Sequence, residues 1–227
     1  MENSQYKLCR EVIRRLGEAG ALKHLIVIGS WCIPLYKEYF AGVAFNTTIR
    51  TRDVDFLIPK PSSFTSTIDL SELLKDLGFV VGFKGEHGVM RLEHPELMIE
   101  FLVPELGRGT DKPIRVPKIG MNAQALRFLN FLTSSTILVQ IDGVPVKLPH
   151  PANFALHKLI VSERRKNEDK MIKDRNAGLQ VLRALIEKGE GALIRKTFES
   201  APRGWQQKIL RVLDELKERS IIELLTD

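Results

Sequence analysis

The sequence has little cysteine and no long apolar run. Only two of its 227 residues are cysteine, Cys9 and Cys32, which is too few for a disulfide framework or a four-thiolate zinc site. No uncharged apolar run reaches the roughly 18 residues that a membrane-spanning helix needs. The first residues also lack the basic-then-apolar pattern of a secretory signal. We therefore expect a cytoplasmic protein without a membrane partner.

The charge of the chain is moderately basic. Lysine and arginine number 34 against 28 aspartates and glutamates, which leaves a formal net charge of +6. The hydrophobic share of 44% and the charged share of 27% are those of ordinary globular proteins, so disorder of the whole chain is excluded. A basic surplus suits nucleotides or RNA, but it is also common in proteins that bind neither. The charge favours an anionic partner without deciding it.

Apolar patterning predicts an α/β part followed by a helical part. Strands are predicted over residues 25–28, 54–58, 79–83, 89–92 and 97–103, and a hairpin over 136–148. Helices are predicted over residues 4–19, 31–40, 70–77 and 126–131, and through most of 152–225. We expect an α/β domain over residues 1–148, with a small mixed sheet flanked by helices, and a helical domain over residues 149–227.

Two aspartates lie two residues apart on a strand that is otherwise apolar. Residues two apart in a strand point to the same side, so Asp53 and Asp55 present two carboxylates about 6–7 Å apart. Such a pair beside apolar neighbours is costly unless a cation lies between the two charges. Mg²⁺ prefers hard oxygen ligands of this kind when phosphates complete its coordination. The pair therefore predicts a metal site for phosphoryl or nucleotidyl transfer.

Two further features of the sequence fit the same chemistry. Gly29 and Ser30 follow a buried strand, where a glycine lets a phosphate approach the backbone and a hydroxyl can donate a hydrogen bond. Glu100 is an acidic residue inside an apolar strand pattern, and it is the best candidate for a third carboxylate. The alternative for Glu100 is a charge on an edge strand. Each signal is weak alone, and the combination is much stronger.

In combination these residues resemble the nucleotidyltransferase superfamily that includes DNA polymerase beta. The resemblance rests on Gly29-Ser30, on residues 51–56 (TRDVDF) and on residues 99–102 (IEFL). Residues 148–159 (LPHPANFALHKL) narrow it to bacterial nucleotidyltransferase-fold proteins that are loosely related to abortive-infection toxin nucleotidyltransferases. The resemblance spans roughly residues 25 to 187.

The resemblance implies Mg²⁺- or Mn²⁺-dependent transfer of a nucleoside monophosphate from an NTP to an acceptor. By the family pattern Gly29 and Ser30 would hold the triphosphate, and Asp53 and Asp55 would bind the metal ions. Glu100 would supply the third carboxylate and help to activate the acceptor. The acceptor is left open between RNA, a protein and a small molecule. The resemblance alone motivates a toxin role with an antitoxin partner.

Basic residues near these motifs have two interpretations each. Arg52, like Arg50, can neutralise charge that develops on the phosphates, or it can pair with the aspartates when no metal is bound. Lys158 resembles a lysine that faces the phosphates in the family, and the alternative is a surface lysine. Asp174 can orient Lys158 or bind the acceptor, and the favoured alternative is a solvated acid in the charged stretch 161–174.

The sequence departs from the family pattern in two places. Twenty-two residues separate Ser30 from Asp53, which is longer than the usual interval, and the third carboxylate is a glutamate where aspartate is commoner. These departures add weight to an alternative function, a non-catalytic module that keeps the fold and binds a nucleotide or a partner. A purely structural interaction protein is a third class, and it predicts no dependence on Asp53 or Asp55.

Overall fold

The computed structural model describes residues 4–48, 51–105 and 112–226, and it contains two compact units. The first comprises Met1–Leu35 and Thr48–Pro149, and the second comprises Tyr36–Thr47 and His150–Asp227. The predicted boundary after residue 148 stays a prediction, and these units additionally assign residues 36–47 to the helical part of the chain. No helix in the described part of the chain combines the length and the apolar character needed to span a bilayer.

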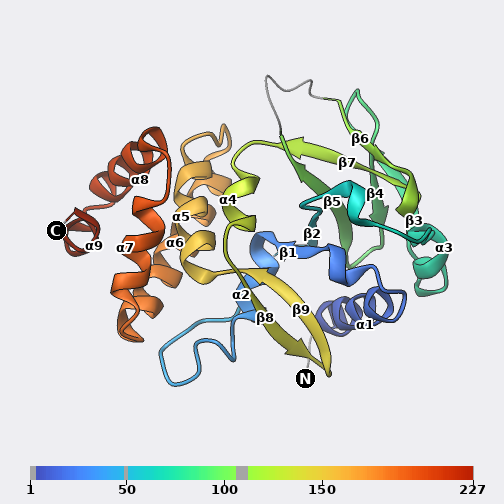
Figure 1. Cartoon of the computed structure of the whole chain (residues 1–227), viewed down its shortest axis with the longest axis horizontal. Helices are drawn as coiled ribbons and strands as arrows, with labels where there is room; N and C mark the ends of the chain where they lie inside the picture. The colour runs from blue at the N-terminus through green and yellow to red at the C-terminus, as the bar shows by residue number, and fades with distance from the viewer. Residues whose placement is uncertain (1–3, 49–50, 106–111, 227) are drawn as a thin grey trace. The chain divides into compact units, whose positions relative to one another are not determined.

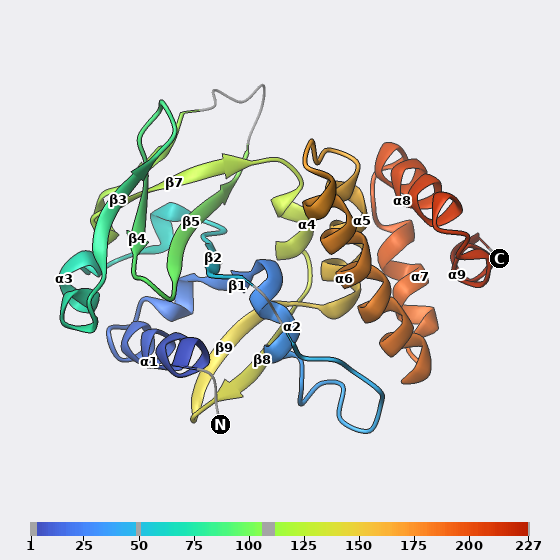
Figure 2. The ribbon, with the colours of Figure 1, turned by 180° about the vertical axis from the view of Figure 1, so that it is seen from behind.

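The first unit is built on a mixed seven-stranded sheet (Figures 1 and 2). Its strands are β1 (Ile26–Ile28), β2 (Asp53–Leu57), β3 (Val80–Lys84), β4 (Val89–Glu93), β5 (Met98–Pro104), β6 (Ile114–Val116) and β7 (Met121–Leu126). The main path runs β1-β2-β5-β4-β3, and β7 pairs with both β5 and β6. Strand β5 runs parallel to β2 and β7, and the other pairs are antiparallel. The predicted small mixed sheet is confirmed.

The two central strands carry an apolar core on one face, and both buried apolar residues and acidic residues on the other. Val54 and Phe56 of β2 and Phe101 of β5 are at most 1% exposed. The rings of Phe56 and Phe101 stack with 5.9 Å between their centroids. Because side chains alternate along a strand, the residues between these apolar positions point to the opposite face. That opposite face carries the acidic residues Asp55 and Glu100.

Helices and a hairpin complete the first unit. Its helices are α1 (Ser4–Glu18), α2 (Cys32–Leu35), α3 (Leu70–Leu74) and α4 (Leu129–Thr133), and its hairpin joins β8 (Thr136–Ile141) to β9 (Val144–Pro149). The side chain of Asp69 accepts hydrogen bonds from two N–H groups at the start of α3, which makes it the expected cap. Asp142 and Gly143, both at positive φ, form the predicted hairpin turn.

Two helix predictions in the first unit are wrong in their extent. The helix expected over 31–40 ends at Leu35, and turns follow it. The helix expected over 126–131 begins only at Leu129, because residues 121–126 form β7. The pairing of β7 with β5, whose partner residues lie more than 20 positions earlier in the chain, determines this strand. Such long-range pairing overrides a short local pattern.

The second unit is helical, as predicted. It contains α5 (Pro151–Ser162), α6 (Glu168–Glu187), α7 (Gly191–Glu199), α8 (Arg203–Glu215) and α9 (Arg219–Thr226), which run from yellow to red in Figure 1. Helix α5 is buried along nearly all of its length. At Gly178 of α6, an added Cβ would lie 3.0 Å from the carbonyl oxygen of Ala155, so the absence of a side chain lets α6 approach α5 closely.

Aromatic and ionic contacts place residues 36–47 in the second unit. The ring of Tyr36 meets that of Phe154 edge-on, with 5.6 Å between their centroids. The hydroxyl of Tyr39 donates a hydrogen bond to Glu190 over 2.6 Å and lies 3.2 Å from Nε2 of His150. Burial, together with the carboxylate of Glu190, raises the pKa of Tyr39, which keeps the hydroxyl protonated as a donor. This segment therefore packs with the C-terminal helices.

Candidate functional site

The parallel pairing of β2 with β5 brings three carboxylates to one face of the sheet. Asp55 is the register partner of Glu100, and Asp53 is the partner of Met98. Register partners in neighbouring strands point to the same side, so Asp53, Asp55 and Glu100 share a face. Asp53 is exposed, Asp55 is half-buried and Glu100 is buried. The structure therefore brings the three predicted acidic residues to neighbouring positions on two strands.

The turn after β1 lies against this acidic face. Residue Ile28 pairs with Asp55, and the chain then enters a short 3-10 turn, η2 (Gly29–Trp31). Gly29 has a φ of +72°, and a Cβ at this position would lie 2.3 Å from Oδ2 of Asp55. Only a glycine leaves room for that carboxylate. The predicted Gly29-Ser30 turn and the predicted Asp55 are thus in direct contact, with Ser30 half-buried beside them.

The carboxylate of Glu100 has a partner that sequence reasoning missed. The ammonium of Lys84, the last residue of β3, lies 2.8 Å from Oε1 and 3.1 Å from Oε2 of Glu100. Glu100 is a central-strand residue and not the edge-strand charge that was its alternative. The only signal in the sequence is that Lys84 immediately precedes the Gly85–Gly88 turn, and nothing in the sequence places it near residue 100.

The three carboxylates are donors that suit a divalent cation, but in the described structure they are not grouped as a metal-binding site. Three carboxylates on one sheet face are hard oxygen donors of the kind that Mg²⁺ binds. The space that Gly29 leaves is filled by an oxygen of Asp55, which therefore lies beside the turn that would receive a phosphate. Within the described ranges, no three histidine, cysteine or acidic side chains are grouped so as to hold a metal ion.

Of the two arginines that precede Asp53 and Asp55, the structure describes only Arg52. Nη2 of Arg52 donates a hydrogen bond to the carbonyl oxygen of His94 over 2.9 Å, so the exposed Arg52 lies near the start of β5. Arg50 lies outside the described residues. The proposed part of Arg52 in nucleotide binding stays a prediction.

The comparison with known families decides the class of the protein. The profile of the nucleotidyltransferase family matches residues 7–203, which is most of the chain. The chain belongs to the nucleotidyltransferase family. This membership confirms the predicted superfamily and the prediction of a nucleotidyltransferase enzyme, whereas the likeness to abortive-infection toxins stays a prediction. No curated protein gives a significant match to this nucleotidyltransferase.

Solved structures resemble this nucleotidyltransferase only loosely. A crystal structure of ANT(2″)-Ia in complex with adenylyl-2″-tobramycin has 15% identity and a TM-score of 0.48, and the match covers 86% of this chain and 99% of that one. The solution structure of the antibiotic-resistance factor ANT(2″)-Ia has 16% identity and the same TM-score, with coverage of 85% and 96%. An antigenic nucleotidyltransferase-like protein from Paracoccidioides brasiliensis has 14% identity and a TM-score of 0.45, with coverage of 95% and 92%.

The second unit of this nucleotidyltransferase holds a buried ionic cluster. The ammonium of Lys158 and Nε of Arg165 each lie 2.6 Å from a different oxygen of Asp174. Lys158 and Asp174 are both buried, so the surface-lysine and solvated-acid alternatives are wrong and Asp174 does orient Lys158. Burial opposes ionisation of Asp174, but Lys158 and Arg165 outweigh it and hold its pKa below the ordinary value. The phosphate-binding role of Lys158 stays a prediction.

A histidine beside this cluster is buried in its neutral form. Burial, helped by the charge of Lys158, lowers the pKa of His157 to about 3. Its Nε2 atom has no hydrogen-bond partner among the described residues. A third cation next to Lys158 and Arg165 is therefore avoided at neutral pH. Because His157 is neutral, it adds no charge to the cluster, which consists of two cations and one carboxylate.

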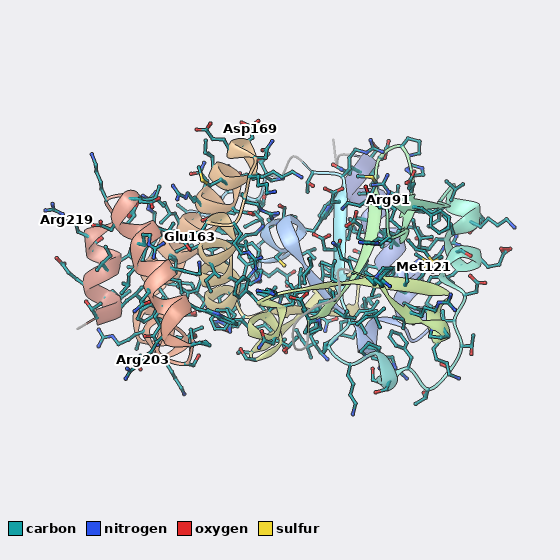
Figure 3. The ribbon with its side chains drawn as sticks, turned by 90° about the horizontal axis from the view of Figure 1, so that it is seen from above. Arg91, Met121, Glu163, Asp169, Arg203 and Arg219 are labelled. Atoms are coloured by element: carbon teal, nitrogen blue, oxygen red, sulfur yellow. The ribbon has the colours of Figure 1, made fainter. Side chains whose placement is uncertain are left out.

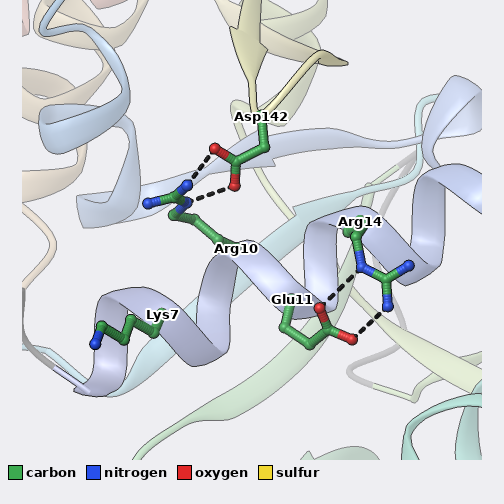
Figure 4. Close-up of a pocket in the computed structure, with 5 residues that line it drawn as sticks. All are labelled: Lys7, Arg10, Glu11, Arg14 and Asp142. Carbon is green, nitrogen blue, oxygen red and sulfur yellow. Dashed lines mark hydrogen bonds and ion pairs between the residues drawn. The ribbon is translucent and has the colours of Figure 1, made fainter.

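A surface cavity on the first unit is lined by charges of both signs. It has a volume of about 250 Å³ and is lined by Lys7, Arg10, Glu11 and Arg14 of α1 and by Asp142 of the hairpin turn (Figure 4). Arg10 binds Asp142, and Arg14 binds Glu11, so most of these charges are satisfied within the cavity wall. None of the five residues belongs to the predicted site.

We predict that Gly29→Ala destabilises the protein more than Gly20→Ala does. Both glycines have a φ of +72°, but a Cβ at Gly20 meets nothing within 4 Å. Gly20→Ala should therefore cost only the strain of a left-handed residue, about 1–2 kcal/mol. Gly29→Ala should cost more, because its methyl group displaces the carboxylate of Asp55. Urea unfolding measures the free energy of unfolding of both variants. Equal decreases would show that the contact between Asp55 and the Gly29 position does not require a glycine.

We predict that Asp174→Asn costs about 3–5 kcal/mol at neutral pH, because it leaves Lys158 buried without a counter-charge. The lowered pKa of Asp174 means that its contribution is present above the ordinary carboxyl pKa and is lost as the pH falls through the folded-state pKa. The difference from wild type should therefore shrink in acid. The double variant Lys158→Met/Asp174→Asn should lose less than Asp174→Asn alone. Urea unfolding between pH 3 and 7 would contradict this account if the difference were independent of pH.

Proposed function

We propose that the protein transfers a nucleoside monophosphate from an NTP to an acceptor hydroxyl in a reaction that depends on a divalent metal ion. The observation that carries the proposal is the contact between the Gly29 turn and Asp55, together with the register that pairs Asp55 with Glu100. A phosphate-binding turn and paired carboxylates are the two parts that nucleotidyl transfer needs, and both belong to the first unit.

In this proposal the glycine-serine turn holds the triphosphate. Gly29 has no side chain to exclude a phosphate from the backbone, and the hydroxyl of Ser30 donates a hydrogen bond to a phosphate oxygen. Asp53, Asp55 and Glu100 hold the metal. A bound Mg²⁺ or Mn²⁺ would neutralise charge on the phosphates and polarise the attacking and leaving oxygens. Arg52 and Lys158 are further candidates for phosphate binding, as the family resemblance implies.

The reaction forms one bond and breaks one. The acceptor oxygen bonds to the α-phosphorus, the bond from that phosphorus to the bridging oxygen of the β-phosphate breaks, and pyrophosphate leaves. The acceptor proton must be removed, and Glu100, the buried carboxylate nearest to Asp55 in the register, is the residue that we assign to assist this step. RNA, a protein and a small molecule all provide a suitable hydroxyl.

One observation favours a second candidate function. In the structure Glu100 is bound to Lys84, so the third carboxylate is already paired with a cation of the protein. A module that binds a nucleotide without transferring it would tolerate this ion pair permanently. The presence or absence of pyrophosphate release in the presence of an acceptor distinguishes the two candidates.

We predict that Mg²⁺ with the preferred NTP raises the melting temperature of the wild type by about 5–10 °C at concentrations near one hundred times Kd. Asp55→Asn should show little or no rise, because it removes a proposed metal ligand. In EDTA the variant should be at least as stable as the wild type, since one of three clustered carboxylates is neutralised. Thermal unfolding in EDTA, in Mg²⁺ and in Mg²⁺ with each NTP measures these differences.

Asp214→Asn is the matched control, because it removes the same charge from an exposed position on α8. It should respond to Mg²⁺ and NTP as the wild type does. If no NTP shifts the wild type, and Asp55→Asn is destabilised in EDTA, then the acidic pair is structural and the proposed function is wrong.

A further inference from the structure

Lys84 reaches the middle of the sheet from its edge. It ends β3, the edge strand, whereas its partner Glu100 lies on β5, with β4 between them. Lys84 pairs in register with Val89 of β4, and Glu100 pairs with Arg91 of the same strand. The lysine side chain must therefore cross β4 to place its ammonium against both oxygens of Glu100. About half of the Lys84 side chain is exposed, at 49%, against 9% for that of Glu100.

The cation closest to Glu100 in the register is bound to another residue. Arg91, labelled in Figure 3, directs its Nε to Oε1 of Glu93 at 2.6 Å. The Glu93 carboxylate in turn occupies the space above Gly82, where an added Cβ would lie 2.0 Å from Oε1. Arg91 is thus held by Glu93, and the more flexible Lys84 is the partner of Glu100.

This arrangement gives the buried carboxylate a cation that can leave. Lysine carries a compact charge on a flexible four-carbon stem, and ion pairs with a half-exposed partner are weak. The ammonium of Lys84 can therefore move into solvent at little cost. A divalent ion that also binds Asp55 gains interactions with two or three carboxylates at once, which a single ammonium cannot match.

We propose that Lys84 is the counter-ion of Glu100 in the metal-free protein, and that a divalent cation binding to Asp55 and Glu100 displaces it. The inference rests on the proposed function, because it takes these carboxylates to be metal ligands. Lys84 is a positioning residue that acts through Glu100: it stabilises the buried charge before the metal arrives, and it competes with the metal for that charge.

Amine acylation of the protein measures the displacement directly. An ammonium that is hydrogen-bonded to both oxygens of Glu100 is shielded from an acylating reagent, and release exposes it. Acetylation of Lys84, read by mass spectrometry, should rise about two- to fivefold when EDTA is replaced by Mg²⁺ alone, the range expected for the loss of a half-exposed ion pair. Lys75, which pairs with Glu72 on α3, is the internal control and should not change.

Glu100→Gln provides the second arm of the labelling experiment. Lys84 should be acetylated rapidly in this variant even in EDTA, and Mg²⁺ should cause no further rise. If Mg²⁺ raises the melting temperature of the wild type but leaves Lys84 acetylation unchanged, the metal binds without displacing Lys84, and the inference is wrong although the proposed function stands. If Mg²⁺, alone and with every NTP, changes neither the melting temperature nor the acetylation of Lys84, then the inference and the proposed function are both wrong.

Metal affinity provides an independent test of the competition. Lys84→Gln should bind Mn²⁺ about two- to fivefold more tightly than the wild type in calorimetric titrations, because the competing cation is gone. Lys75→Gln removes the same charge from a Lys–Glu pair outside the acidic face, and it should bind Mn²⁺ as the wild type does. Weaker or unchanged binding by Lys84→Gln would overturn the inference.

Discussion

The parallel register of β2 with β5 is the constraint on which the candidate site depends. The parallel pairing of β2 with β5 places Asp55 beside Glu100, with Asp53 two residues along on the same face. Clustered carboxylates raise the free energy of a folded state unless cations or hydrogen bonds compensate for them. The protein tolerates them because the opposite face of the same strands is a tightly packed apolar core that includes Phe56 and Phe101.

The two units neutralise their buried carboxylates in different ways. Asp174 of the second unit is held by two cations, one of them the buried Lys158. Glu100 of the first unit has one cation, and that cation is half-exposed and comes from an edge strand. In our proposal the first arrangement stays in place, whereas the second is exchanged for a metal ion.

The sequence predicts the elements of the candidate site better than the contacts between them. Local pattern is enough to place Asp53 and Asp55 on a strand and to put Gly29 after one. The ion pair of Lys84 with Glu100 depends on the registers of β3 with β4 and of β4 with β5, which no local pattern specifies. The prediction of a solvated Asp174 is wrong for a similar reason: its charged neighbours indicate a solvated face, whereas the packing of α6 on α5 buries it.

A crystal structure with Mn²⁺ and a non-hydrolysable NTP tests the central claim most directly, because anomalous scattering locates the metal without reference to activity. We predict Mn²⁺ bound by Asp55 and Glu100, phosphate oxygens against the turn at Gly29, and the Lys84 ammonium beyond hydrogen-bond distance of Glu100. Mn²⁺ and the triphosphate bound elsewhere, with the Lys84–Glu100 ion pair intact, would contradict this prediction.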